Sequence, residues 1–277
     1  MLAGIGLFGL LDANSKLLAE GHGVWQVLLV RFATILAGVA LLRALLPGWG
    51  GPVTSRYPRL QLARACVALG SAFFFFLAFA RLPLAEGYLV FFLSPFFVLL
   101  LAAFLLKEPP PAAAWGWSAL GFAGVALGLA PGLGAQDAPL LGYAAAFAGT
   151  VCYSFVFILN RQLRSEPGAA RVLVWPAALG LLVCLPPGVL EWRSPSAFSL
   201  ALMVVNGLIV AAATVALAEA FRHADAARLA PFGYSGLVWS LTFDLAIWGQ
   251  VPAWLTLAGA LIVVAACLLS ERAASRR

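Results

Sequence analysis

Four ionisable residues lie well inside apolar stretches of the chain: Asp12, Lys16, Arg31 and Asp244. A charge at the centre of a membrane helix costs about 3 kcal/mol on insertion scales, so each should face protein or water and have a partner. Asp12 and Lys16 are four residues apart and share one helix face. Two interpretations stay open: an internal ion pair that fixes this helix to its neighbours, or a carboxylate whose protonation opens and closes a gate. We expect Arg31 to pair with Asp12 or Asp244.

Helical spacing also links small and polar residues near the end of the chain, at Gly233, Ser240 and Asp244. Residues three, four or seven apart share a helix face, so this stripe indicates the lining of a cavity. The alternative is helix–helix packing through small residues. An earlier stretch of related sequence presents an equivalent face, and the predicted lining comprises Tyr88, Phe92, Gly233, Gly236, Ser240 and Asp244.

Amides and aromatic rings form a third group of candidates. Tyr153 and Phe157 share one helix face, and Asn14 and Asn206 lie in two other apolar stretches. Together they could bind the ammonium or carboxylate of a small zwitterion; the alternative is hydrogen bonding between helices. Most aromatic residues are expected to face lipid or to pack in the core. A minority inside the cavity, with Phe74 as our candidate, would favour apolar or aromatic side chains of a substrate.

These residues must be positioned by a scaffold that lies in a membrane. The chain of 277 residues is 63% hydrophobic and 10% charged, whereas soluble domains are about 25% charged. About 20 apolar residues cross a bilayer as a helix. The predicted fold class is therefore an all-α polytopic membrane protein with ten transmembrane helices. The expected spans are residues 2–19, 24–46, 60–80, 84–106, 112–130, 140–159, 169–189, 197–221, 226–248 and 253–270.

The fourth expected span, residues 84–106, carries Pro95 near its middle. A proline removes a backbone donor and kinks the helix, which lipid tolerates only where protein or water satisfies the freed carbonyl. A shift of 141 residues lays this stretch on the ninth span, where Pro231 and Gly236 are the helix breakers. We predict that these three residues act as gating hinges.

Five expected spans precede the loop at residues 131–139, and five follow it. Because five is odd, equivalent helices run in opposite directions, as in inverted-repeat transporters whose substrate site lies between the halves. We therefore divide the chain into a first five-helix repeat, residues 1–135, and an inverted second repeat, residues 136–277, which together form one structural domain.

Lysine and arginine are distributed unevenly between the two sets of loops. Thirteen lie on one side, Arg81 and Arg193 lie on the other, and Lys16 and Arg31 lie within spans. The positive-inside rule then places the larger set and both termini in the cytoplasm. The basic residues form no patch, so nucleic acid is not expected as a partner. We also expect no cleaved signal peptide, because the first apolar stretch lacks a basic flank and a cleavage site.

Several classes of function lack their sequence motifs. The absence of an HExxH motif and of paired catalytic carboxylates argues against an intramembrane enzyme, and the absence of a phosphate loop argues against an ATP-driven pump. The four cysteines stand alone in apolar runs, so neither a metal site nor a disulfide framework is predicted. We expect no cofactor and no ATPase partner, and the choice between monomer and dimer stays open.

The two broken spans begin with LPLAEGYLVFFLSP and HADAARLAPFGYSG, and KEPP and GQVP precede the fifth and tenth spans. In these motifs and in its five-plus-five organisation, the chain resembles the EamA-type transporters of the drug/metabolite transporter superfamily. It looks most like the YddG branch of aromatic amino acid exporters. The resemblance implies a bacterial inner (plasma) membrane protein with a cavity lined mainly by spans one, three, four, six, eight and nine.

Repeat, helix breaks and resemblance together predict a secondary transporter that exports small metabolites, amino acids including aromatic ones, by alternating access. Two alternatives remain. One is an exporter of a different small solute, such as a drug, a nucleotide precursor or a sugar derivative, and the other is a channel-like facilitator. The expected partners are a small-molecule substrate and the lipid bilayer.

Overall fold

Helices make up almost all of the described chain, and the described residues contain no strand. The computed structural model describes residues 2–105, 107, 112–134, 139–166, 168–223 and 235–275, with the backbone alone at 112–115, 118, 218–223, 267 and 270–275. Seven described helical segments are long and apolar enough to cross a membrane, with residues Leu84–Leu105 counted as one segment. The predicted all-α polytopic fold class is therefore confirmed.

The helices follow the expected spans closely. They are α1 (Leu2–Ala19), α2 (Val24–Leu45), α3 (Pro58–Phe79), α4 (Leu84–Phe91), α5 (Ser94–Leu105), α6 (Ala112–Leu133), α7 (Leu140–Gln162), α8 (Ala169–Leu190), α9 (Ala197–His223), α11 (Ser235–Trp248) and α12 (Trp254–Ser275). Within lipid the backbone can satisfy its hydrogen bonds only inside each helix, which is why apolar runs of this length become helices and the polar connections remain short.

The fourth span is broken in its middle, as Pro95 predicts. The helix α4 ends at Phe91 and α5 begins at Ser94. Because a proline nitrogen carries no proton, the usual bond from this nitrogen to the carbonyl four residues earlier cannot form. The turn instead tightens, and the Leu93 N–H donates to the Val90 carbonyl at 3.0 Å. The predicted hinge at Pro231 and the lining residue Gly233 lie outside the described residues.

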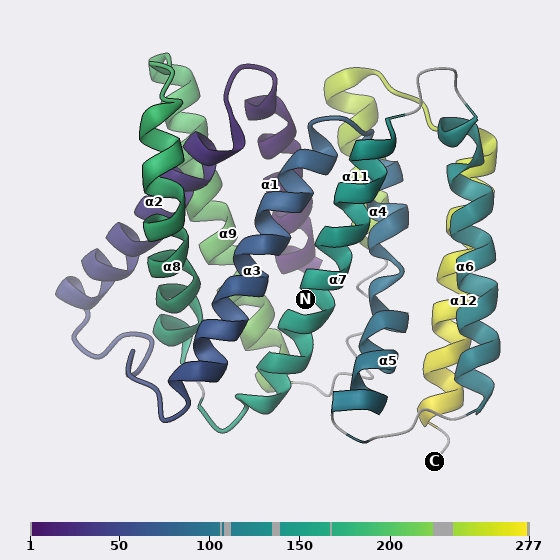
Figure 1. Ribbon diagram of the computed structural model, residues 1–277, viewed down its shortest axis with the longest axis horizontal. Coiled ribbons are helices and arrows are strands. Elements are labelled where there is room, and N and C mark those ends of the chain that lie inside the picture. The colour runs from purple at the N-terminus through teal and green to yellow at the C-terminus, as the bar shows by residue number, and fades with distance from the viewer. Residues whose placement is uncertain are drawn as a thin grey trace.

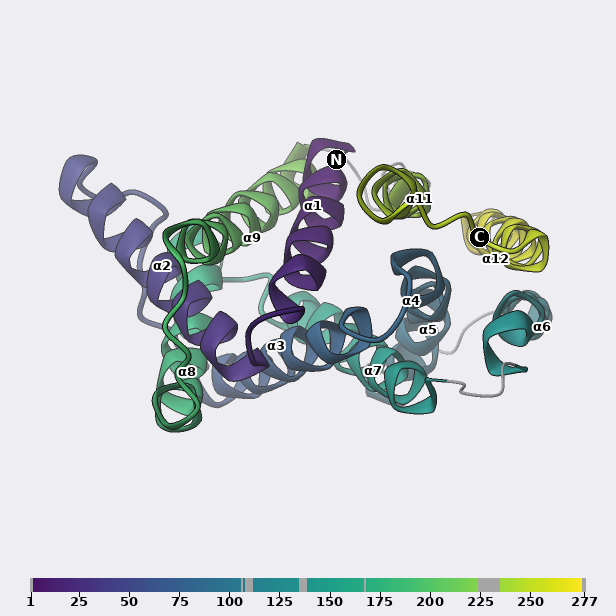
Figure 2. The same cartoon turned by 90° about the horizontal axis from the view of Figure 1, so that it is seen from above.

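The helix pairs that pack together follow a regular pattern. Extensive pairs are α1 with α9, α3 with α7, α2 with α8, and α6 with α12, and α4 also packs on α11. If each of the first five spans is exchanged with its equivalent among the last five, the pair α1 with α9 becomes the pair α7 with α3. The other three pairs, α2 with α8, α6 with α12 and α4 with α11, are unchanged by this exchange. Figure 1 shows the helices standing side by side, and Figure 2 shows α1 crossing the middle of the bundle while α6 and α12 form its far edge. This pattern agrees with the predicted inverted repeat, which stays a prediction.

Glycine brings α6 and α12 together. A Cβ atom built on Gly259 would lie 2.6 Å from the backbone nitrogen of Gly128, and one built on Gly124 would lie 3.0 Å from the Gly259 carbonyl. Small residues of this kind allow membrane helices to approach closely without a hydrophobic driving force. The seam joins the fifth and tenth spans within one chain.

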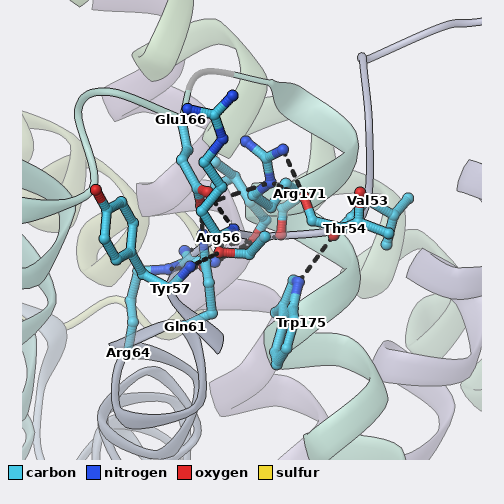
Figure 3. A network of polar contacts seen from close by, with 11 residues as sticks. Val53, Thr54, Arg56, Tyr57, Gln61, Arg64, Glu166, Arg171 and Trp175 are labelled. Carbon is cyan, nitrogen blue, oxygen red and sulfur yellow. Dashed lines mark hydrogen bonds and ion pairs between the residues drawn. The ribbon is translucent and has the colours of Figure 1, made fainter. Parts of the chain in front are cut away.

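One carboxylate, that of Glu166 between α7 and α8, organises the loop that joins α2 to α3 (Figure 3). The Ser55 hydroxyl donates to it, as do the Arg56 backbone N–H at 2.5 Å and the Gln61 amide at 3.4 Å. The Arg171 guanidinium lies 3.9 Å away. The Ser55 hydroxyl first, and then these other donors and the arginine charge, hold the pKa of Glu166 below its usual value despite some desolvation.

The glycine seam predicts opposite effects for one substitution at two positions. Gly259→Ala should lower the free energy of unfolding by about 1–3 kcal/mol, because its methyl group would overlap the Gly128 backbone. Gly116→Ala has open space at its Cβ position and should leave stability unchanged or raise it by up to about 1 kcal/mol through helix propensity. Thermal unfolding of both variants in detergent tests this, and equal stabilisation by the two would contradict the close approach of α6 and α12.

The lowered pKa of Glu166 predicts a change in how stability depends on pH. The ionised carboxylate stabilises the fold above its unfolded-state pKa of about 4.3, and this contribution disappears as pH falls through the lower folded-state pKa. Glu166→Gln should therefore lower Tm at neutral pH and flatten the fall of Tm between about pH 5 and pH 3.

The matched control is Glu191→Gln, an exposed carboxylate just beyond the opposite end of α8. It should leave the dependence of Tm on pH as it is in the unsubstituted protein. An unchanged curve for Glu166→Gln as well would mean that the loop is held without this carboxylate.

Candidate functional site

Polar residues of the candidate site lie on two different faces of the helix α1. Asp12 and Lys16 reach toward α4 and α11, whereas Asn14 and Ser15 reach toward α2 and α9. The i and i+4 spacing of the first two residues places them on one face. Because α1 lies at the middle of the bundle (Figure 2), both faces of the helix meet other helices rather than lipid.

Lys16 forms an ion pair with Asp244, with 3.3 Å between Nζ and Oδ1. The same ammonium group donates to the Gln250 amide oxygen at 3.3 Å and lies 4.4 Å from the centre of the Trp248 ring. The Trp248 indole N–H in turn donates to Glu20 at 3.2 Å. These contacts join the end of α1, in the first half of the chain, to the end of α11, in the second half.

The Asp244 carboxylate also caps the helix α4. It accepts the backbone N–H of Leu84 at 3.1 Å and that of Ala85 at 2.9 Å. The first N–H groups of a helix have no partner within it, and the helix dipole favours a negative charge there. One carboxylate therefore connects α11, α1 and the first turn of α4. We name Lys16, Asp244 and the first turn of α4 the closure cluster.

Asp12 is bound by the Tyr88 hydroxyl, which donates to its Oδ2 at 2.7 Å. The Tyr88 ring packs against α11, where a Cβ atom added to Gly236 would come within 2.8 Å of it. Its aromatic neighbours come from three helices. They are Phe79 on α3, Phe91 at the end of α4 and Phe92 just after it, and Tyr153 on α7, whose ring centre lies 5.0 Å from that of Phe91.

Arg31 binds neutral partners, which corrects the expectation that it pairs with Asp12 or Asp244. Its Nε donates to the Asn206 amide oxygen at 2.6 Å and its Nη2 to the Ser15 hydroxyl at 3.0 Å. Asn206 donates in turn to Asn14 at 2.7 Å. Lys16 and the first turn of α4 bind Asp244 instead, and the Tyr88 hydroxyl binds Asp12. No carboxylate of the described side chains lies within ion-pair distance of Arg31.

A cavity of about 300 Å³ opens beside the closure cluster. It is lined by the ends of α1 and α3, by the turn before α4 and by the end of α11. Two cations, Lys16 and Arg81, one acid, Glu20, and the Trp248 ring face it. This cavity lies at the end of α3 opposite the loop that joins α2 to α3, and Phe79, which stacks on Tyr88, forms part of its lining.

The structure brings together some of the predicted lining residues and separates others. Ser240 is fully buried and donates to the Leu237 carbonyl. Phe74 packs on Phe73, which contacts Trp25, whereas Phe79 stacks on Tyr88. Phe157 is 39% exposed. One step along a helix rotates a side chain by about 100°, which is sufficient to move these two rings away from Asp12. A role for them in binding stays a prediction.

Several residues of the site are missed by sequence analysis. Ser15 accepts hydrogen bonds from both Arg31 and Asn206, and Gln250 and Glu20 complete the surroundings of Lys16. The position of Ser15 next to Asn14 and Lys16 is the one signal that could have indicated it. Gln250 and Glu20 lie in connections, where single polar residues carry no periodic signal.

Comparison with known proteins defines the class first. One solved structure, titled "Crystal structure of protein", superposes with a TM-score of 0.68 over 99% of this chain and 97% of that chain, at 23% sequence identity. This likeness shows the fold alone. Together with the apolar helices, it identifies an all-α polytopic membrane protein.

Residues 140–272 match the model described as the EamA-like transporter family. An S-adenosylmethionine uptake transporter of Rickettsia conorii is 27% identical over 198 residues, which cover 70% of this chain and 66% of that protein. A pseudopaline exporter, CntI, of Pseudomonas aeruginosa is 26% identical over 210 residues, which cover 72% and 69%. The chain thus spans just under two thirds of the first of these relatives. The matches support the EamA-like transporter family, within the drug/metabolite transporter superfamily.

The buried guanidinium predicts a large effect of removing one amide. Asn206→Ala should lower the free energy of unfolding by roughly 2–3 kcal/mol, because it removes a short hydrogen bond to the charged Arg31 side chain. The same substitution at the exposed Asn160 is the control and should change stability by less than about 0.5 kcal/mol. Denaturant or thermal unfolding in detergent measures both, and equal small effects would mean that water replaces the lost amide.

Proposed function

We propose that this protein is a secondary transporter that exports small metabolites, amino acids including aromatic ones, across a bacterial inner membrane by alternating access. The family match and the transporter names of the relatives support movement of a small solute. The observation that carries the proposal is the closure cluster. There one ion pair, Lys16–Asp244, joins the two halves of the chain at one end of the bundle, and we propose that this contact separates.

Access from the side of the cavity requires the closure cluster to open. Parting α1 and α4 from α11 breaks the Lys16–Asp244 pair and frees the first N–H groups of α4. The shift of 141 residues lays Asp244 on Ala103, so the equivalent position of the other half carries no carboxylate. The two sides are therefore closed by different chemistry, and a substrate or a proton can favour one closure over the other.

The break between α4 and α5 supplies a place where such movement can occur. Pro95 cannot donate to the Phe91 carbonyl, and the Ser154 hydroxyl lies 3.4 Å from the Ser94 carbonyl. Bending at Pro95 changes the direction of α5 without disturbing the cap of α4. We propose the same role for Pro231 and Gly236 in the ninth span, on the strength of the sequence repeat.

Aromatic amino acids fit the side chains that meet at the centre. The rings of Phe79, Phe91 and Tyr153 offer edges and faces to a planar side chain. The Asp12 carboxylate attracts an ammonium group, and the Arg31 guanidinium attracts a carboxylate. One relative is named for uptake and one for export, so the direction of transport is proposed from the family resemblance and from the topology in which both termini are cytoplasmic.

The experiment is exchange of labelled phenylalanine by the purified protein in liposomes. Saturable exchange that accelerates when unlabelled phenylalanine is present on the opposite side is expected for alternating access. Tyr88→Phe, which removes the hydroxyl that binds Asp12, should slow exchange about tenfold or more, as loss of a charge-assisted hydrogen bond allows. Tyr57→Phe, in an exposed loop position, is the control. Linear flux would indicate a channel-like facilitator, and exchange of other solutes alone would indicate a different substrate.

The closure cluster is tested by charge removal in pairs. Lys16→Gln and Asp244→Asn should each lower the free energy of unfolding by about 3–5 kcal/mol, because each leaves one buried charge without its partner. The double variant should lose less than either single variant, since it leaves neither. Unfolding in detergent gives these values, and simple additivity of the two losses would show that the two charges do not depend on each other.

A further inference from the structure

A second cavity, of about 450 Å³, lies away from the closure cluster and from the candidate substrate site. Its walls are the apolar side chains of α3 and α8, and the loop residues Val53 and Thr54 form its upper rim. The cleft is open to the outside of the bundle, because Leu62 on one wall is 48% exposed and Leu182 on the other is 70% exposed. Figure 2 shows α3 and α8 side by side at the outer edge of the molecule.

The rim of this cleft is held firmly in place. The Trp175 indole N–H donates to the Val53 carbonyl at 3.0 Å, and the Arg171 guanidinium donates to the Thr54 carbonyl. Figure 3 shows the Trp175 ring beneath this backbone, with the Glu166 and Arg56 side chains above it. These hydrogen bonds attach the loop at Val53 and Thr54 to α8, so the rim of the cleft is a fixed part of the fold.

Positive charge gathers at the rim. Arg56 and Arg59 are both exposed, and Arg59 precedes the wall residue Leu62 by three positions in α3, so it shares the face of the helix that borders the cleft. Glu166 is the one acid bound to this loop among the described side chains, and its oxygens are occupied by Ser55, Arg56 N–H and Gln61. No ion pair found among the described side chains includes Arg56 or Arg59.

We propose that this cleft binds one acyl chain of an anionic phospholipid whose phosphate is held by Arg56 and Arg59. An apolar slot that faces lipid and ends at a cationic rim matches a molecule with an apolar tail and a negatively charged head. A second protein is a poorer match, because a helix of about 10 Å diameter is wider than a slot between two packed helices. The inference depends on the membrane location of the chain and not on the proposed transport.

The test is retention of lipid by the detergent-purified full chain, measured by native mass spectrometry. Phosphatidylglycerol and phosphatidylcholine with the same acyl chains are supplied in equal amounts. The unsubstituted protein should retain phosphatidylglycerol in preference. Arg56→Gln and Arg59→Gln should each lower that retention about fivefold, whereas Arg193→Gln, an exposed arginine beyond the opposite end of α8, should leave it unchanged.

A second variant separates the acyl chain from the head group. Ala178→Trp fills the cleft without changing the charge of the rim, and it should lower phosphatidylglycerol retention at least as much as loss of one arginine does. Glycerol phosphate, which has the charge but no chains, should not displace the lipid. Equal retention of the two lipids, undiminished retention by Ala178→Trp, or displacement by glycerol phosphate would each overturn the proposal.

Discussion

The central constraint on this structure is that a charged side chain within the membrane must be paired with or hydrogen-bonded to other polar groups of the protein. The Asp244 carboxylate meets this constraint for three elements at once, since it pairs with Lys16, accepts two N–H groups from the first turn of α4 and is carried by α11. Removing any one contributor leaves unsatisfied groups on the other two.

The remaining buried polar groups obey the same constraint by a different route. Arg31 is surrounded by an amide and a hydroxyl instead of an acid, and Asp12 is bound by a phenol. Hydrogen bonds to a charged group are stronger than those between neutral groups, so these partners can hold the charges without neutralising them. Asp12 and Arg31 are thus held by hydrogen bonds, whereas Lys16 and Asp244 form an ion pair.

The two ends of the bundle differ in construction. At the closure cluster, helices from both halves of the chain meet through the Lys16–Asp244 ion pair, and a cavity lies directly beside it. At the arginine-rich end, the Glu166 network binds the backbone of a loop to the starts of two helices. In the proposed alternating access, the closure cluster is the contact that would open, and the Glu166 network is the part that would stay fixed. The lipid-facing cleft lies on the firmly held end.

The sequence by itself determined the helices, their approximate limits, the break before Pro95 and the need for Asp12, Lys16, Arg31 and Asp244 to have partners. These features depend on apolar length, on proline and on the cost of charge in lipid, all of which are local. The tertiary structure alone decided which partners they have, because the sequence offers several possible partners for each charged group and gives no reason to prefer one of them. It also decided that Phe79, rather than Phe74, stacks on Tyr88, since the rotation of α3 about its axis is set by its packing against α7 and α8.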